Sequence, residues 1–297
     1  MGIDIHNLNF LAHAQDRGVR FERTLAIGRQ AVFVEPGDLE AHRVRRGLAP
    51  LPEVPAYFEP VLTQWFGARE ADAVDASPYE GARLIHDMNA PWPAASPELG
   101  RFDAVLDFGC LEHVFNFPVA WRNCVDLCRV GGHVLHALPA NNLSGHGFYQ
   151  FSPELFFNLY QPERGFELLD IFFAQKADHR HWWRVASPLA VRRRVNLCNS
   201  HEVYMLVLAR KLREPGEQPP PQQSDYAKDE WLKSPGAPVA AKASQPRAAV
   251  RVLEALGLRD TLRGARERWR AMGRSGLALP APDYTRVDVA SLIGRAG

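Results

Sequence analysis

The chain has 297 residues, of which 46% are hydrophobic and 23% are charged. This balance is sufficient to bury a complete α/β core. The formal net charge of +1 at pH 7 argues against a surface that binds nucleic acid throughout. No apolar run approaches the roughly 20 residues of a membrane span, and the first residues lack the apolar core of a signal peptide. We therefore expect a soluble, cytoplasmic protein with no nucleic-acid partner.

The first third of the chain alternates between helix and strand patterns. Residues 3–18 predict a leading helix, and residues 21–34 predict a first buried strand with a turn at Gly28. A segment rich in Pro and Arg then leads to an amphipathic helix within residues 52–66. Two short strands follow, at residues 71–74 and 83–86, and they end at Asp75 and Asp87.

Residues 102–160 carry the strongest pattern, which is that of a βαβ unit. Two apolar runs, at 104–106 and 134–138, predict buried strands, and apolar residues at helical spacing between them predict a crossover helix. We expect this helix to end at Arg129, with Gly131 and Gly132 supplying a left-handed stop. Ligands of open α/β sheets bind beyond the carboxyl ends of the strands. The polar residues at 107–113 and 139–149 are therefore the candidates for a site.

Two further apolar runs of strand length, at residues 166–173 and 203–209, are joined by a loop of about two dozen residues, which is long for such a connection. The loop contains His179, His181, Trp182 and Trp183, and it is either a lid over a substrate or a surface loop. A zinc site at the two histidines lacks further ligands, so we expect no metal. The four cysteines form no C-x-x-C pair and are expected to be structural thiols.

The composition divides the chain into three parts. We expect a domain over residues 1–212, a disordered Pro- and Gln-rich linker over 213–246, and a basic amphipathic helical tail over 247–297. Eight arginines lie between Arg247 and Arg274. The tail either packs its leucines on the main domain or contacts an anionic membrane or a protein partner.

The order strand, acid, strand, acid, followed by FDAVLDFGCLEHV and RVGGHVLHALP, resembles the class I S-adenosylmethionine-dependent methyltransferases. It is most similar to the methyltransferase type 11/12-like group with a Leu-Glu-His-Val run, and HGFYQFSPELFF resembles a bacterial subgroup. The resemblance covers about residues 21–211. It implies a Rossmann-like α/β fold whose mostly parallel, seven-stranded sheet ends in an antiparallel hairpin. The glycine-rich loop is degenerate, because AIGRQAVF retains only Gly28.

The resemblance implies S-adenosylmethionine as the cofactor and assigns residues to it. A carboxylate at a strand end accepts two hydrogen bonds from a vicinal diol, which suits Asp75 to the ribose. Arg29 would pair with the carboxylate at the methionine end, and an aromatic face such as that of Phe108 would attract the sulfonium. The implied cofactor-binding residues are Gly28, Arg29, Asp75, Asp87, Met88 and Phe108.

The acceptor side is expected after the fourth and fifth strands. His113 is the natural general base near neutral pH, with Glu112 orienting a neighbour. Asn141, His146 and Tyr149 are expected to contact the acceptor. The alternatives are that His113 caps the next helix and that the asparagines serve turn geometry.

The predicted reaction is methyl transfer to an oxygen or nitrogen of a small-molecule or glycan-type acceptor. The alternative is a catalytically inactive, methyltransferase-like binding or scaffold protein. A dinucleotide-dependent enzyme is disfavoured, because the G-x-G-x-x-G pattern is missing.

Overall fold

The computed structural model describes residues 2–191, 194–197, 199–216, 219–224 and 283–294. Most of the expected linker and tail, and Cys198, lie outside the described residues. The other three cysteines are free thiols, as predicted. Among the described residues, no helix combines the length and apolar character needed to cross a membrane.

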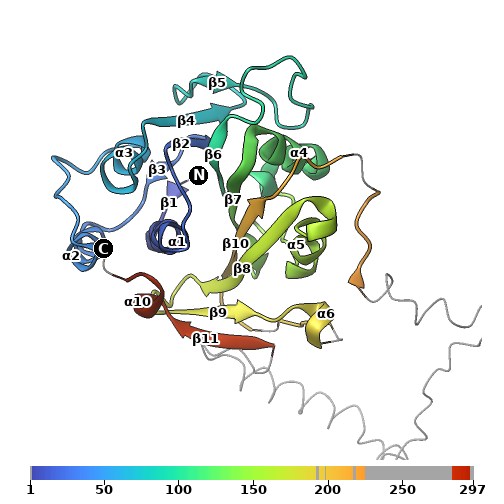
Figure 1. The fold of residues 1–297 in the computed structure, drawn as a ribbon. Helices are drawn as coiled ribbons and strands as arrows, with labels where there is room; N and C mark the ends of the chain where they lie inside the picture. Colours follow the sequence, from blue (N-terminus) through green and yellow to red (C-terminus); the bar gives the residue numbers. More distant parts are fainter. Residues whose placement is uncertain (1, 192–193, 198, 217–218, 225–282, 295–297) are drawn as a thin grey trace, which may run out of the picture.

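A mixed sheet of nine strands forms the centre of the molecule, in the order β11-β9-β8-β10-β7-β6-β2-β4-β5 (Figure 1). Five neighbouring strands run parallel: β5 (Leu84–Ile85), β4 (Glu70–Asp75), β2 (Arg23–Ile27), β6 (Phe102–Phe108) and β7 (Cys128–Asn141). Next to β7, β10 (Val203–Lys211) pairs antiparallel with both β7 and β8 (Phe166–Gln175). The Rossmann-like α/β fold is therefore as predicted.

The sheet has nine strands rather than the expected seven, because two strands extend its edge beyond β8. They are β9 (His181–Val185), from the long loop, and β11 (Tyr284–Asp288), from the C-terminal region. Trp182 and Trp183 on β9 are fully buried, so this part of the loop is core and is not a lid. A short helix, α6 (Pro188–Val191), follows β9.

The described end of the chain differs from the predicted helical tail. It forms β11 and a single turn of helix, α10 (Val289–Leu292). The buried guanidinium of Arg46 holds this end, donating hydrogen bonds to the Gly294 carbonyl at 2.8 Å and to Asp16 at 2.5 Å. Residues 283–294 therefore pack against the sheet and α2.

Helices cover both faces of the sheet and divide the apolar residues into two cores. Helices α4 (Phe117–Leu127) and α5 (Pro153–Leu159) pack on one face. The other face is covered by α1 (Ile5–Asp16) and α3 (Glu59–Phe66), with α2 (Pro36–Arg46) beside them. Asp4 begins α1, since its carboxylate accepts a hydrogen bond from the Asn7 amide at 2.9 Å. Strand β6 contributes to both cores, with Val105 on the α4 side and Leu106 on the α1 side.

The predicted end of the crossover helix is wrong by two residues. Helix α4 ends at Leu127, and Cys128 is already extended as the first residue of β7. Gly131 has a φ of 80°, but it lies within the strand. A Cβ on Gly132 would lie 2.9 Å from a backbone oxygen of β6. Gly132 therefore lets β7 lie close to β6, and neither glycine stops the helix.

β2 does not lead directly into a helix that returns to the sheet. Residues 28–30 lead into β3 (Ala31–Val32), which pairs in parallel with β1 (Gly2–Ile3) in a separate two-stranded sheet. The helix that precedes β4 is α3, some thirty residues further on. The single predicted strand over residues 21–34 is therefore two strands that belong to different sheets.

Candidate functional site

The strand order creates a switch point between β2 and β6. Strands β4 and β5 lie on one side of β2, whereas β6 and β7 lie on the other. In open α/β sheets, ligands bind beyond the carboxyl ends of the strands at such a point. Gly28 follows β2 there with a φ of 75°, and Gly109 follows β6 with a φ of 86°.

Asp75 and Gly28 lie side by side at this edge. The Gly28 amide donates a hydrogen bond of 2.7 Å to the carbonyl of Val74, the residue before Asp75. The half-buried Asp75 side chain makes no hydrogen bond or ion pair with any residue that the structure describes. Its carboxylate is therefore available to a ligand, and the structure brings together two of the residues predicted to bind the cofactor.

Asp87 is exposed at the surface, whereas the neighbouring Met88 is buried. The exposed Asp87 carboxylate accepts two hydrogen bonds from Asn89, one from its backbone amide and one from its side chain, each 2.9 Å. These bonds hold the pKa of Asp87 below its usual value. Met88 is buried, with Asn123 Nδ2 3.9 Å from its sulfur. Asp87 therefore shapes a turn, and Met88 belongs to the core on the α4 side.

Two residues predicted to contact the cofactor are engaged within the fold. Arg29 donates to Glu59 at 2.7 Å and to the Glu80 carbonyl, and its guanidinium lies 3.8 Å from the centre of the Tyr57 ring. Its charge is matched within the protein, so it is not free for a ligand carboxylate. Phe108 is only 1% exposed and packs in the core beneath α1, which leaves no ring face for a sulfonium.

A buried chain of hydrogen bonds fixes the turn that follows β6. Asp107 Oδ1 accepts from the amides of Cys110 and Leu111, at 3.2 and 3.1 Å, and so begins the 3₁₀ turn η1 (Leu111–His113). Asp107 Oδ2 lies 2.7 Å from His136 Nδ1, and His136 Nε2 lies 2.6 Å from the Tyr160 hydroxyl. The prediction missed this chain, although a histidine inside the apolar run VLHAL was a signal for a buried polar partner.

Glu112, at the centre of η1, is the most unusual acid at this edge. Its side chain is buried, and neither carboxylate oxygen has a hydrogen-bond partner among the described residues. Burial, with a smaller contribution from the Asp107 charge, raises the pKa of Glu112 to about 8. The buried carboxyl group is therefore held without the donors that such a group normally requires.

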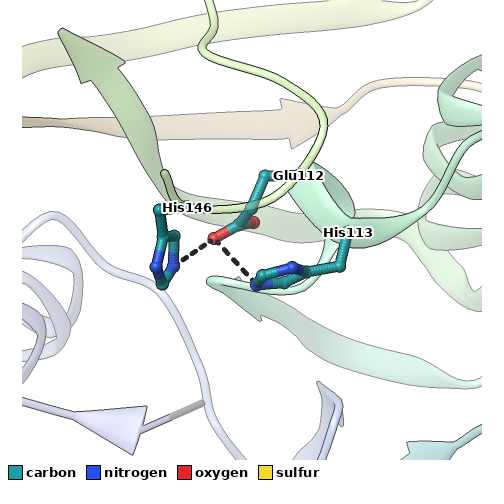
Figure 2. Close-up of side chains that lie close together, drawn as sticks. All are labelled: Glu112, His113 and His146. Carbon is teal, nitrogen blue, oxygen red and sulfur yellow. Dashed lines mark ion pairs between the residues drawn. The ribbon is translucent and has the colours of Figure 1, made fainter. Parts of the chain in front are cut away.

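Two histidines face Glu112 (Figure 2). Glu112 Oε1 lies 3.4 Å from His146 Nε2 and 3.9 Å from His113 Nε2. The two imidazole rings meet edge to face, with their centres 5.1 Å apart, and both side chains are about half exposed. Burial, and then the neighbouring His146, lowers the pKa of His113. The structure thus gathers both predicted catalytic residues and one predicted acceptor residue.

Gly147 explains how His146 reaches this position. The loop after β7 folds back onto η1, where the Glu112 carbonyl accepts a 2.7 Å hydrogen bond from the Phe148 amide. A Cβ on Gly147 would lie 2.7 Å from that carbonyl oxygen, and the φ of Gly147 is 79°. Only glycine fits both constraints.

The other predicted acceptor residues are engaged within the fold. Asn141 donates to Asn199 Oδ1 at 3.1 Å, and the Tyr149 hydroxyl donates to the Phe115 carbonyl at 2.7 Å. Asn142, with a φ of 58°, donates hydrogen bonds from its side chain to Asn199 and to the His201 carbonyl. The turn alternative therefore describes the asparagines, and Tyr149 positions the loop.

No protein-family model matches the chain, and no curated protein matches it. Among solved structures, it is similar to the trans-methyltransferase CalH in complex with SAH, with 16% identity and a TM-score of 0.36 over 68% of this chain and 54% of CalH. It is also similar to the 1,6-didemethyltoxoflavin-N1-methyltransferase of Burkholderia thailandensis, with 19% identity and a TM-score of 0.39 over 70% of this chain and 78% of that enzyme. A third is the N-methyltransferase NodS of Bradyrhizobium japonicum WM9 in complex with S-adenosyl-L-homocysteine, with 14% identity and a TM-score of 0.40 over 69% of this chain and 85% of NodS. The chain spans about half the length of CalH.

Proposed function

We propose that the protein is an S-adenosylmethionine-dependent methyltransferase that acts on an oxygen or nitrogen of a small-molecule or glycan-type acceptor. The observation that carries this proposal is the unpartnered carboxylate of Asp75, which lies beside Gly28 at the switch point of the sheet. A carboxylate in this position accepts hydrogen bonds from the two hydroxyls of a ribose. A protein without a nucleoside ligand has no evident use for an unpaired acid there.

The residues at this edge fit the nucleoside part of the cofactor better than its methionine part. Asp75 and Gly28 are open to a ligand, whereas Arg29 is already paired with Glu59. The buried Gln30 side chain donates to the Ile27 and Gly28 carbonyls, at 3.2 and 3.0 Å, and fills the turn. When bound, the cofactor supplies an activated methyl group. The chain would hold the nucleoside at Asp75 and present an acceptor from the side of His113 and His146.

Placement supports this assignment of the acceptor side. Turn η1 follows β6, and the loop of His146 follows β7, so both lie beyond the carboxyl ends of strands on the far side of the switch point from Asp75. Methyl transfer requires mainly that donor and acceptor be held in line and shielded from water. Side chains from two adjacent strand ends are suited to orienting an acceptor in this way.

Calorimetric titration with S-adenosylhomocysteine tests the proposal. The wild-type protein should bind it, and Asp75→Asn should lower the affinity by about ten- to one-hundredfold, since hydrogen bonds to a charged group contribute roughly 1.5–3 kcal/mol. Because the Asp75 side chain has no partner among the described residues, the melting temperature of the Asp75→Asn variant should stay close to that of the wild type. Glu163→Gln is the matched control, an exposed acid on η2 (Pro162–Arg164) before β8. Absence of binding to the wild type at millimolar ligand would refute the proposal.

A non-catalytic binding or scaffold protein is the second candidate. The Arg29–Glu59 pair and the buried Gln30 favour it, because they rebuild the loop in which the resembled family binds the methionine end. This candidate predicts a stable protein that binds neither S-adenosylmethionine nor S-adenosylhomocysteine. The same titration therefore separates the two functions.

A further inference from the structure

We propose that Glu112, His113 and His146 form a binding site for a divalent transition-metal ion. Each residue offers one ligand atom, and these three atoms lie within 4.8 Å of one another. Two imidazoles and one carboxylate are the ligand set of many catalytic zinc sites and of non-haem iron sites. This proposal departs from the expectation from the sequence that the chain holds no metal.

The two distances from Glu112 to the histidine nitrogens are close to those around a single ion. Ligand atoms at 2.0–2.2 Å from a tetrahedral zinc ion are about 3.3–3.6 Å apart. The 3.4 Å between Glu112 Oε1 and His146 Nε2 falls in this range, and the 3.9 Å to His113 Nε2 needs only a small ring rotation. Both imidazoles are about half exposed, so they are free to make this adjustment. Their exposed side leaves coordination positions open to water or a substrate.

The buried carboxyl group of Glu112 is an independent reason to expect a cation. Its side chain is 1% exposed, and both oxygens lack a hydrogen-bond partner among the described residues. The histidine nitrogens do not meet this need, because 3.4 and 3.9 Å exceed the length of a normal N–H···O hydrogen bond. Burying a carboxyl group without hydrogen-bond partners is costly, and metal coordination removes that cost.

The backbone around the three residues holds them in place before any ion binds. Asp107 fixes the start of η1 through the amides of Cys110 and Leu111. Gly147 and the Phe148 amide press the loop of His146 against the Glu112 backbone. A site built on two braced turns loses little conformational entropy when it binds an ion.

The proposal does not rest on methyl transfer, since the three ligands come from the geometry alone. If the protein is a methyltransferase, the ion would lie on the acceptor side of the site, away from Asp75. The two proposals therefore fail separately: titration of metal-free protein with S-adenosylhomocysteine tests the first, and titration with metal in the absence of nucleoside tests the second.

The experiment uses the full chain without a polyhistidine tag, stripped with EDTA. Titration with Zn²⁺ by calorimetry, and with Co²⁺ by visible absorption, should show one ion per chain with a micromolar or lower Kd for Zn²⁺. Mg²⁺ should bind at least one hundredfold more weakly, because imidazole is a poor ligand for it. Glu112→Gln and His146→Ala should each weaken Zn²⁺ binding at least tenfold and reduce the Co²⁺ absorption.

Two further variants make the test specific. His179→Ala removes a half-exposed histidine that faces Asp38 at 3.7 Å, far from η1 in sequence, and should leave Zn²⁺ binding unchanged. Gly147→Ala keeps all three ligands but forces the His146 loop away from Glu112, and it should weaken binding while the circular dichroism stays native. The proposal is overturned if the wild type binds no Zn²⁺ or Co²⁺ below 100 μM. It is also overturned if Glu112→Gln and His146→Ala bind like the wild type.

Discussion

The buried chain Asp107–His136–Tyr160 should stabilise the fold through coupled hydrogen bonds. It joins β6, β7 and the residue after α5, and all three side chains are at most 1% exposed. Replacing His136 with leucine puts an apolar side chain of similar size at this position of β7. It leaves one Asp107 oxygen and the Tyr160 hydroxyl without partners in the core.

The expected cost follows from which groups lose partners. Leaving a buried hydrogen-bonding group without its partner costs roughly 1–3 kcal/mol, and more for a charged group. Asp107 keeps its two backbone donors on the other oxygen, and the Tyr160 hydroxyl also loses its partner, so we expect about 3 kcal/mol for His136→Leu. Tyr160→Phe removes one hydrogen bond and should cost about 1–2 kcal/mol. The double variant should lose about 1–2 kcal/mol less than the sum, because the hydroxyl orphaned by leucine is then absent.

Urea unfolding followed by tryptophan fluorescence measures these free energies, and the chain has seven tryptophans as probes. His133→Leu is the matched control. It makes the same substitution on the same strand, where the histidine ring forms no hydrogen bond with the described residues. The reasoning fails if His136→Leu changes stability by less than about 0.5 kcal/mol, or if the two single effects add within that margin.

Two other buried groups give further predictions. Lys211 Nζ donates to the Val125 and Cys128 carbonyls at the end of α4, each at 2.8 Å. Lys211→Met should therefore lower the free energy of unfolding by about 2–4 kcal/mol in urea titrations. An unchanged free energy would show that these two hydrogen bonds do not stabilise the end of α4. Burial, and then Arg46, lowers the pKa of His42 to about 4. Since the unfolded chain binds that proton more readily, His42 alone should cost the wild type about 3 kcal/mol of stability as pH falls from about 6.5 to 4, and a His42→Gln variant should lose correspondingly less over that range. Identical pH profiles would refute this.

The order of helices and strands was largely readable from the sequence. Apolar runs such as 104–106 and 166–173 are too short and too continuous for helices, and they lie in β6 and β8. Boundaries set by tertiary contact were not readable. A Gly-Gly pair is typical of the end of a helix, but the role of Gly132 depends on the close approach of β6, which lies earlier in the sequence.

The predicted site residues divide in the same way. The shared location of Asp75 and Gly28 was predictable, because strand ends converge at one edge of a parallel sheet whatever the details of packing. The surroundings of Arg29 and Phe108 were not predictable, because they come from segments whose folding the local sequence does not specify: Glu59 on α3 and the packing of α1 on the sheet.

The sequence by itself determined that this chain folds as an α/β sheet with acids and histidines at its strand ends, because hydrophobic periodicity and chain order are local properties. Only the tertiary structure decided which of these groups meet. Glu112 and His146 are 34 positions apart and show no metal-ligand spacing, yet the close contact between Gly147 and the Glu112 backbone sets their side chains 3.4 Å apart. Packing also buried the Glu112 carboxylate without a donor, and that unsatisfied group is what indicates a cation there.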